Sequence, residues 1–229
     1  MIIAVIPARG GSKRIPRKNL KVFLGHPIIA YAIRAARDTG VFDRIIVSTD
    51  DEEIAAVSRA EGADVPFMRP PELSGDHTAT VDVVRHAADW VAANIGPVDF
   101  VCCIYPTAVF VDGETLKRGF DEMRAAGTDY AVSVVRYSAP IERAMRITDK
   151  GRLAAVNIEG MAMRSQDIEE ACHDAGQFYW GSPAAFAATQ AERIARAVPV
   201  ILPRTRVQDI DTEEDWLNAE LLYRTFFGG

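Results

Sequence analysis

The sequence predicts an α/β fold in one domain, residues 1–229, built on a mostly parallel, twisted sheet with helices on both faces. Three observations predict this. Short apolar runs alternate with segments of helical apolar spacing along the chain. With 229 residues of ordinary composition, the chain is long enough to bury a core. A Gly-containing loop follows the first apolar run, where open α/β sheets hold ligands.

The individual elements are predicted from apolar patterns and from the residues that typically begin and end helices and strands. Pro27 opens the first helix and Gly40 closes it, and Thr212 and Asp215 form a capping pair at the start of the last helix. Strands are expected at residues 2–6, 44–48, 65–67, 100–104, 130–135, 178–180 and 198–202. Helices are expected at residues 27–39, 52–62, 81–94, 113–126, 183–189 and 212–226.

Composition excludes several classes of protein. The net charge is -6 and the basic residues gather in one loop, which argues against general nucleic-acid binding. No run of eighteen apolar residues exists, and residues 1–6 are too short for a signal peptide, so no membrane partner is expected. Cys102, Cys103 and Cys172 lack metal-ligand spacing, and we expect reduced core thiols in a cytoplasmic protein.

The loop after the first strand is strongly basic. No acidic residue precedes Asp38, and Gly10, Gly11 and Ser12 stand among six cations: Arg9, Lys13, Arg14, Arg17, Lys18 and Lys21. Glycine backbone N–H groups and charge-assisted hydrogen bonds suit a polyphosphate, although a solvated basic loop is the alternative. The glycine patterns of the P-loop and of the dinucleotide-binding fold are both missing.

A second signal is a pair of carboxylates near the C-terminus. Asp209 and Asp211 flank Ile210 in a segment expected to be extended, so both carboxylates would share one face. Opposite a polyphosphate they would hold Mg²⁺. The alternative is that Asp211 or Thr212 only caps the last helix. Asp50 and Asp51 form a rival pair, in which Asp51 suits a helix N-cap and the role of Asp50 stays open.

The stretch IPARGGSKRIPRKN resembles the signature loop of the acylneuraminate cytidylyltransferases, the CMP-sialic acid synthetases. That family makes CMP-sugars from CTP and a nine-carbon acidic keto-sugar and releases pyrophosphate. The resemblance extends over nearly the whole chain. It implies a Rossmann-like three-layer nucleotidyltransferase fold, and a homodimer joined through a sugar-binding excursion at about residues 136–180.

The resemblance also implies roles for residues of the nucleotide site. Arg69 would face the base and Thr78 would lie near it, whereas the alternative pairs Arg69 with Glu72 and makes Thr80 a helix cap. The family's D-I-D-T element binds the metal, which matches Asp209 and Asp211. The remaining nucleotide-binding residues would be Ala8, Arg9, Gly10, Gly11, Ser12, Lys13, Lys18 and Asn19. The catalytic ones would be Arg9, Lys13, Lys18 and Asp211, with Arg14 and Arg17 as helpers at the phosphates.

On the sugar side, Tyr105-Pro106-Thr107 is similar to the family's Q-P-T-S-P element, with Tyr105 replacing its Gln. The stretch HDAGQFYWG resembles the branch that acts on pseudaminic acid, where typical sialic acid enzymes carry Asn-Gly. On composition alone, this stretch is a polar pair in a turn followed by a buried aromatic strand. By resemblance the sugar-binding residues are Tyr105, Arg164, Gln166, His173, Asp174, Gln177 and Tyr179.

These observations together predict Mg²⁺-assisted nucleotidyl transfer. The anomeric hydroxyl of pseudaminic acid would attack the α-phosphorus of CTP in line, and pyrophosphate would leave. The alternatives are the same reaction on N-acetylneuraminic, legionaminic or 3-deoxy-octulosonic acid, or a catalytically silent nucleotide-binding module. A dehydrogenase is disfavoured by the missing glycine fingerprint.

Overall fold

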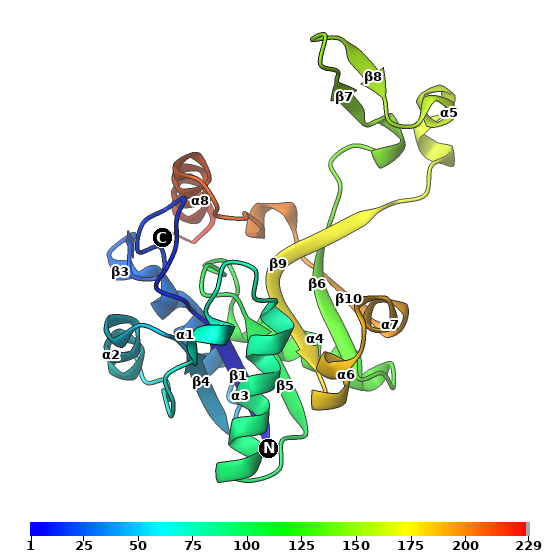
Figure 1. The fold of residues 1–229 in the computed structure, drawn as a ribbon. Coiled ribbons are helices and arrows are strands. Elements are labelled where there is room, and N and C mark those ends of the chain that lie inside the picture. Colours follow the sequence, from blue (N-terminus) through cyan, green and yellow to red (C-terminus); the bar gives the residue numbers. More distant parts are fainter. Residues whose placement is uncertain (228–229) are drawn as a thin grey trace.

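A six-stranded sheet forms the centre of the protein in the computed structural model, which describes residues 1–227 (Figure 1). Its strands, in spatial order, are β10 (Val198–Ile201), β6 (Tyr130–Arg136), β9 (Cys172–Gly181), β5 (Phe100–Ile104), β1 (Ile2–Pro7) and β4 (Arg44–Ser48). β9 runs antiparallel to both of its neighbours, and the other pairs are parallel. The sheet is mostly parallel, as predicted.

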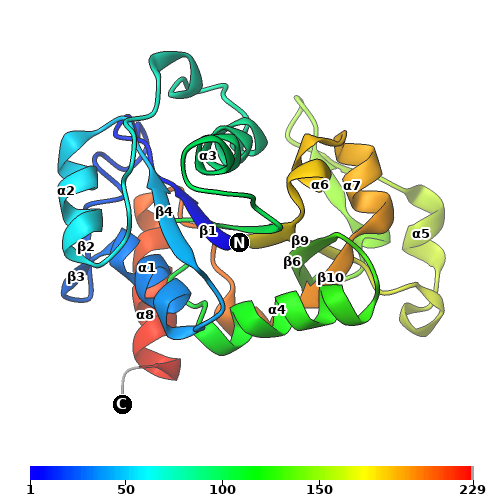
Figure 2. The same cartoon turned by 90° about the horizontal axis from the view of Figure 1, so that it is seen from below.

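Helices cover both faces of the sheet (Figure 2). One face packs on α1 (Ile28–Asp38), α2 (Glu52–Ala60) and α4 (Gly113–Ala125), and the other on α3 (Thr80–Asn94) and α6 (Pro183–Ala187). In β1, Ala4 and Ile6 face the first set of helices while Ile3 and Val5 face the second. Burial on both faces explains why the strand is a continuous apolar run.

The last helix, α8 (Glu213–Phe226), packs beside the basic loop through a third apolar cluster. Trp216 on α8 contacts the cluster that contains Ile15 and Phe23 from the loop region. Thr212 and Asp215 form the predicted capping box at its start. The chain also contains the two-residue strands β2 (Val22–Phe23) and β3 (His26–Pro27), and helix α7 (Gln190–Arg196).

Two predicted elements differ from the structure. Residues 65–67 do not form a strand, because Pro66 lacks an N–H and only Asp64 bridges to Ile46 of β4. The helix predicted at 183–189 forms as α6, which ends at Ala187, and a further helix that was not predicted, α7, follows it. The chain becomes extended at Ala188, and Thr189 begins α7 with a capping box to Glu192.

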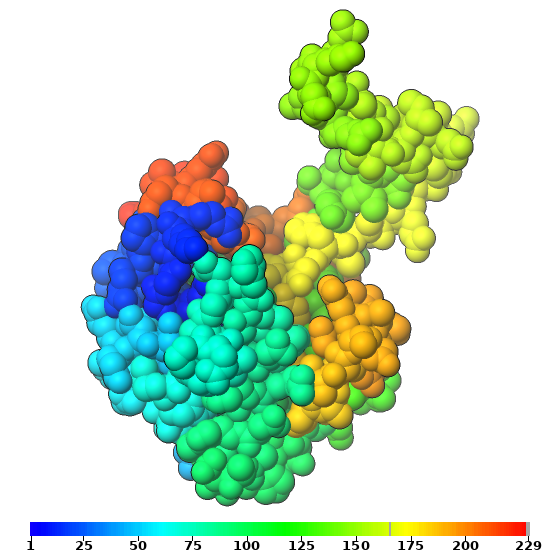
Figure 3. Space-filling view, in the orientation of Figure 1, coloured from blue at the N-terminus to red at the C-terminus, as the bar shows by residue number. Residues whose placement is uncertain are grey.

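Residues 137–171 leave the body of the protein and project as an arm (Figures 1 and 3). The arm carries the hairpin β7 (Met145–Ile147) and β8 (Leu153–Ala155), helix α5 (Ile158–Ala162), and 3-10 turns at Ile141–Arg143 and Ser165–Asp167. Further 3-10 turns lie at Pro71–Leu73 and Arg204–Arg206. The excursion was expected over about 136–180, but β9, which follows the arm, belongs to the central sheet.

The cysteines are all free, but they do not share one environment. Cys102 and Cys103 are buried in β5, whereas Cys172, at the start of β9, is exposed. The prediction of core thiols is therefore wrong for Cys172. None of the helices in the described part of the chain combines the length and apolar character that a membrane crossing requires.

Candidate active site

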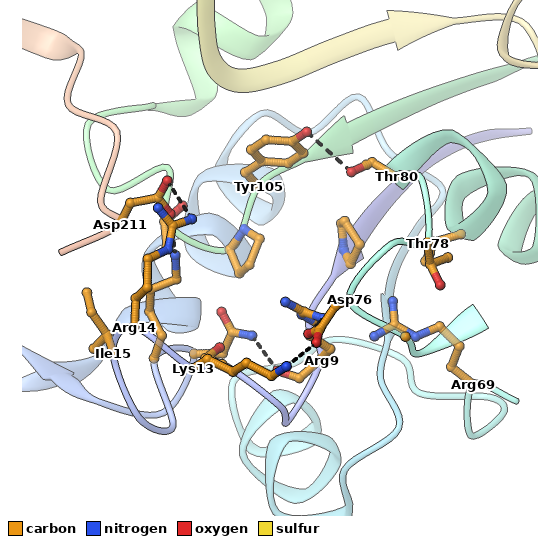
Figure 4. A pocket seen from close by; sticks show the side chains of 18 of the residues that line it. Arg9, Lys13, Arg14, Ile15, Arg69, Asp76, Thr78, Thr80, Tyr105 and Asp211 are labelled. Atoms are coloured by element: carbon orange, nitrogen blue, oxygen red, sulfur yellow. Dashed lines mark hydrogen bonds and ion pairs between the residues drawn. The ribbon is translucent and has the colours of Figure 1, made fainter. Parts of the chain in front are cut away.

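A pocket of about 400 Å³ lies at the carboxyl ends of the central parallel strands (Figure 4). It is bounded by the loop after β1, the segment before α3, the turn after β5 and the segment before α8. Ligands of open α/β sheets bind at this edge because the connecting loops converge there. The polar side chains that line it are Arg9, Ser12, Lys13, Arg14, Lys18, Asn19, Arg69, Asp76, Thr78, Thr80, Tyr105, Thr107, Asp209 and Asp211.

The loop after β1 is held in place by polar contacts at both ends. Gly10 donates its backbone N–H to Asp50 Oδ1 at 3.0 Å, and Asn19 Nδ2 donates to the Arg9 carbonyl at 2.9 Å. A Cβ on Gly10 would lie 2.7 Å from Asp51 Oδ2, so only glycine fits without displacing that side chain. Asp50, whose role the sequence left open, therefore anchors the loop.

Four of the six loop cations face the pocket. Arg9 and Lys13 both pair with Asp76, with Arg9 Nη1 2.7 Å from its Oδ1. Arg14 Nη2 lies 2.9 Å and Lys18 Nζ 3.3 Å from the Asp211 carboxylate. Lys13 and Arg9, by hydrogen-bonding to the Asp76 carboxylate, hold its pKa below the usual value.

The remaining two loop cations turn away from the pocket. Arg17 pairs with Asp51 and Glu53 at the start of α2, and Asp51 also caps that helix as predicted. Lys21 pairs with Glu213 and lies over the Trp216 ring, 4.5 Å from its centroid. The expectation that Arg17 assists at the phosphates is therefore wrong, because its guanidinium is committed to α2.

Three predicted nucleotide-binding residues contribute no side chain to the pocket lining. Ala8 is fully buried in the core, and Gly10 packs against Asp51. A Cβ on Gly11 would meet nothing within 4 Å, so this residue borders open space. Contact between any of these residues and a nucleotide would have to run through the backbone, and stays a prediction.

Arg69 is a buried cation in the pocket wall. Its side chain is 3% exposed, and its Nη2 lies 3.6 Å from Asp50. Its Nε and Nη2 find no hydrogen-bond partner within residues 1–227, and burial lowers the pKa of its guanidinium. The alternative pairing with Glu72 does not occur, since Asp50 is the ion-pair partner that the structure gives it. Thr78 lies in the same wall (Figure 4).

Asp209 and Asp211 both line the pocket, and Ile210 between them is fully buried. The segment joins no sheet, but its two ends are extended as expected. Ile210 points into the core and the two aspartates toward the pocket, because the backbone is extended at Val207 and Thr212 and Ile210 packs in the apolar cluster under α8. Thr212 caps α8, as the alternative proposed, while the metal-binding role of Asp209 and Asp211 stays a prediction.

The two carboxylates have different surroundings. Asp211 is paired with Arg14 and Lys18, whereas the Asp209 side chain accepts no hydrogen bond from the described residues. Desolvation and the neighbouring Asp211 carboxylate raise the pKa of Asp209. No three metal-ligating side chains gather anywhere in the described chain. Two carboxylates with phosphate oxygens nevertheless suit Mg²⁺, which keeps several waters and takes few protein ligands.

A second cavity of about 570 Å³ adjoins the pocket and shares Thr80 and Tyr105 with it. It lies between β6, β9, α6 and α7, and its lining is mainly apolar, with His173, Asp174 and Tyr179 among the polar residues. Thr80 does not cap α3 as the alternative proposed; Ala79 is the N-cap, and the Thr80 hydroxyl lies 3.3 Å from the Tyr105 hydroxyl. Burial raises the pKa of the Tyr105 and Tyr179 phenols.

Three predicted sugar-binding residues lie outside these cavities. Arg164 and Gln166 are exposed on the arm and line neither cavity. Gln177 is 1% exposed, with Nε2 donating to the Ala175 carbonyl at 3.3 Å, so its side chain is part of the protein interior. The assignment of Gln177 to the sugar site therefore has no support from the cavity linings and stays a prediction.

Sequence reasoning missed two contributors to the site. Asp76 is one of them: nothing in the sequence singles it out, and it pairs with both Arg9 and Lys13. Gln190, Arg193 and Ile194 of α7 line the second cavity, but α7 itself was not predicted. The Thr189–Glu192 capping box was the available signal for α7.

Comparison with known proteins identifies the family. A family model described as "Cytidylyltransferase" matches residues 3–159. The chain belongs to the cytidylyltransferase family. The pseudaminic acid cytidylyltransferase of Campylobacter jejuni is 36% identical over 97% of this chain and 96% of its own length. The CMP-N,N'-diacetyllegionaminic acid synthase of Legionella pneumophila is 32% identical over 96% of this chain and 95% of its own length.

Known structures agree with the fold of this cytidylyltransferase. A CMP:2-keto-3-deoxy-manno-octonic acid synthetase complexed with CTP has a TM-score of 0.70, with 16% identity, and the match covers 98% of both chains. A 4-diphosphocytidyl-2C-methyl-D-erythritol synthase from Anaerococcus prevotii has a TM-score of 0.63, with 13% identity. The prediction of a Rossmann-like nucleotidyltransferase fold is confirmed, as is the resemblance to the cytidylyltransferases.

Proposed function

We propose that this cytidylyltransferase joins CTP to pseudaminic acid, forming CMP-pseudaminic acid and pyrophosphate. One observation carries the proposal: a single pocket unites four loop cations with the Asp209 and Asp211 carboxylates. That combination suits a polyphosphate that brings a divalent cation. The choice of sugar rests on the Campylobacter relative, similar over nearly the full length of both chains.

The cations would bind and orient the triphosphate. Arg9 and Lys13 would neutralise the phosphates that leave as pyrophosphate, in competition with Asp76, which accepts from both in the structure. Lys18 is steadied by the Ile210 carbonyl at 2.7 Å, so its ammonium points at the same region as Asp211. Arg69, with donors left free inside the wall, would hold the base.

Asp209 and Asp211 are the residues that would hold Mg²⁺. Asp209 fits this role because its carboxylate accepts no hydrogen bond from the described residues, and Asp211 because its carboxylate lines the same pocket beside two loop cations. When bound, Mg²⁺ supplies charge neutralisation at the phosphates and lowers the pKa of a coordinated hydroxyl. The two aspartates would hold the ion at the phosphates of CTP, where the anomeric hydroxyl of the sugar acid would attack the α-phosphorus and displace pyrophosphate.

The sugar acid would enter from the second cavity. A groove lined by Tyr105, Asp174, Tyr179 and Asp209 runs from that cavity's wall to the Asp209 carboxylate. A sugar held along this groove would present its anomeric carbon toward the nucleotide pocket. Tyr105 borders the pocket, the cavity and the groove, so it stands where sugar and nucleotide would meet.

We further propose a cytoplasmic homodimer that pairs through the arm. The three free cysteines suit a reducing compartment. The arm exposes an unusual density of large apolar side chains, among them Met145, Ile147, Leu153, Val156, Ile158, Met161 and Met163. Apolar surface of this kind marks a protein interface. Arg164 and Gln166 lie on the same arm, so in the homodimer they would contact the sugar bound in the partner's site.

Pyrophosphate release with CTP, Mg²⁺ and separate sugar acids tests the proposal. We expect turnover with pseudaminic acid and little with N-acetylneuraminic acid. The Legionella relative favours legionaminic acid as the second candidate, and preference for it would keep the reaction and change the substrate. CTP binding without turnover on any acid, 3-deoxy-octulosonic acid included, would overturn the enzymatic proposal in favour of a nucleotide-binding module.

A further inference from the structure

Two hydrogen-bonded pairs line the second cavity, and one of them, Thr80 with Tyr105, also borders the nucleotide pocket. Tyr179 donates its phenolic proton to Asp174 Oδ2 at 2.7 Å. The Thr80 and Tyr105 hydroxyls lie 3.3 Å apart, and the rings of Tyr105 and Tyr179 meet edge to face, with centroids separated by 5.6 Å. Tyr179, Asp174 and Tyr105 all border both the second cavity and the connecting groove.

An irregularity in β9 brings Asp174 and Tyr179 together. They are five residues apart in sequence, yet they pair opposite Val134 and Val132, which are only two residues apart on β6. Because residues i and i+2 of a strand share a face, Asp174 and Tyr179 become neighbours on the cavity side. The chain between them bulges at Gly176, whose φ of +61° is a left-handed conformation that favours glycine.

The direction of the Tyr179 hydrogen bond is fixed by its partner. An ionised carboxylate has no proton to give, so Tyr179 must donate its single proton to Asp174. Asp174 is held in turn by the Gly176 N–H, which donates to Oδ1 at 2.8 Å. Both carboxylate oxygens therefore have donors. The Tyr179 oxygen is left with lone pairs alone to offer to any other group.

We propose that Asp174 is a specificity-determining positioning residue that makes the Tyr179 oxygen an obligate acceptor for an N–H or O–H group of the sugar acid. This inference rests on the proposed function. The donor best suited to the site is the N–H of an acylamido group, since apolar Val132 and Phe186 in the adjoining wall can contact its acyl carbon chain. An acid with only an acceptor at that position would face oxygen against oxygen and bind poorly.

Asp174→Asn is the sharpest variant because it changes the hydrogen-bond direction with little change in shape. The Gly176 N–H requires an acceptor, so the amide oxygen stays there and the amide NH₂ faces Tyr179. The NH₂ then donates to Tyr179, whose proton turns toward the sugar. We expect KM for pseudaminic acid to rise about tenfold or more and KM for CTP to change less than about twofold.

Tyr179→Phe and the double variant separate positioning from structure. If Asp174 acts through Tyr179, Tyr179→Phe raises the sugar KM similarly and the double variant is no worse than Tyr179→Phe alone. Tyr31→Phe is the matched control, because Tyr31 donates to the Phe23 carbonyl in another part of the fold. KM does not depend on the amount of folded enzyme, so partial loss of folding would not mimic the result.

The outcomes distinguish this inference from the proposed function. Wild-type turnover of pseudaminic acid with an unchanged sugar KM in Asp174→Asn would overturn the inference alone. Fully additive effects of Asp174→Asn and Tyr179→Phe, or an effect on CTP rather than sugar, would do the same. Absence of wild-type turnover with every nonulosonic acid would overturn the proposed function and this inference together.

Discussion

Arg69 is a charged side chain that the fold buries without satisfying all its donors. Its Nε and Nη2 have no partner among the described residues, and Asp50 is 3.6 Å away. Buried donors of this kind are costly unless a ligand completes them. The wall they occupy is the nucleotide pocket, so we attribute their bonds to the base of CTP.

Arg69→Lys should weaken CTP use. Lysine keeps the charge but lacks the planar fork, so we expect KM for CTP to rise about tenfold or more. Initial rates at saturating sugar acid measure this, with Arg37→Lys on the exposed side of α1 as the control. An increase in the sugar KM with an unchanged CTP KM would contradict a role at the base.

Asp76 competes with phosphate for two of the loop cations. Asp76→Asn should leave Arg9 and Lys13 free, so we expect CTP and pyrophosphate to bind about two- to fivefold more tightly. Calorimetric titration with each ligand checks this, with Asp82→Asn on α3 as a control. Weaker CTP binding in Asp76→Asn would mean that the Asp76 carboxylate itself assists the nucleotide.

At the scale of elements, close contact between α4 and β9 depends on a glycine. A Cβ on Gly119 would lie 2.9 Å from Phe178 Cε2 and 3.2 Å from Trp180 Cδ1. Gly119→Ala should lower the free energy of unfolding by about 1–3 kcal/mol, because overpacking outweighs the gain of about 1 kcal/mol in helix propensity. Urea denaturation measures it. Lys117→Ala, exposed on the same helix, should change stability by less than about 0.5 kcal/mol, and a stabilised Gly119→Ala would refute close packing.

The regular elements were predictable because local patterns determine them. β4 and β5 match the predicted bounds, and the α8 capping box was visible as Thr212 and Asp215. The strand expected at 65–67 does not form, because an apolar run alone does not show whether a neighbouring strand can pair with it. α7 lies beyond the helix predicted at 183–189 and was not predicted, although Thr189 and Glu192 carried a start signal.

The sequence predicted the site residues that lie close together along the chain. It did not predict the contacts that depend on how the strands pair. The basic loop and the Asp209–Asp211 pair were found from composition and alternation, and the structure brings them into one pocket. The pairing of Asp174 with Tyr179 depends on the β9 irregularity, which no sequence spacing announces. Arg17 was misplaced because its partners, Asp51 and Glu53, come from a separate element.

At the scale of the whole molecule, the arm exposes large apolar side chains that a single chain does not bury. Ile147 and Ile158 are each 76% exposed there. We expect the double variant Ile147→Glu, Ile158→Glu to weaken dimerisation about 100-fold or more, because charges would be buried in an apolar interface. Sedimentation across protein concentrations measures this, with Lys150→Glu in the hairpin turn as the control. A monomeric wild type would contradict the proposed dimer.

The central claim is that one pocket performs nucleotidyl transfer, with Asp209 and Asp211 holding the metal. Its most direct test is the rate of pyrophosphate release by Asp209→Asn, with CTP and pseudaminic acid, across a range of Mg²⁺ concentrations. Glu214→Gln, which neutralises an exposed carboxylate in the first turn of α8, is the control. We predict at least about a 100-fold loss in Asp209→Asn and wild-type rates in the control. Wild-type turnover by Asp209→Asn at ordinary Mg²⁺ would show that Asp209 does not hold the metal.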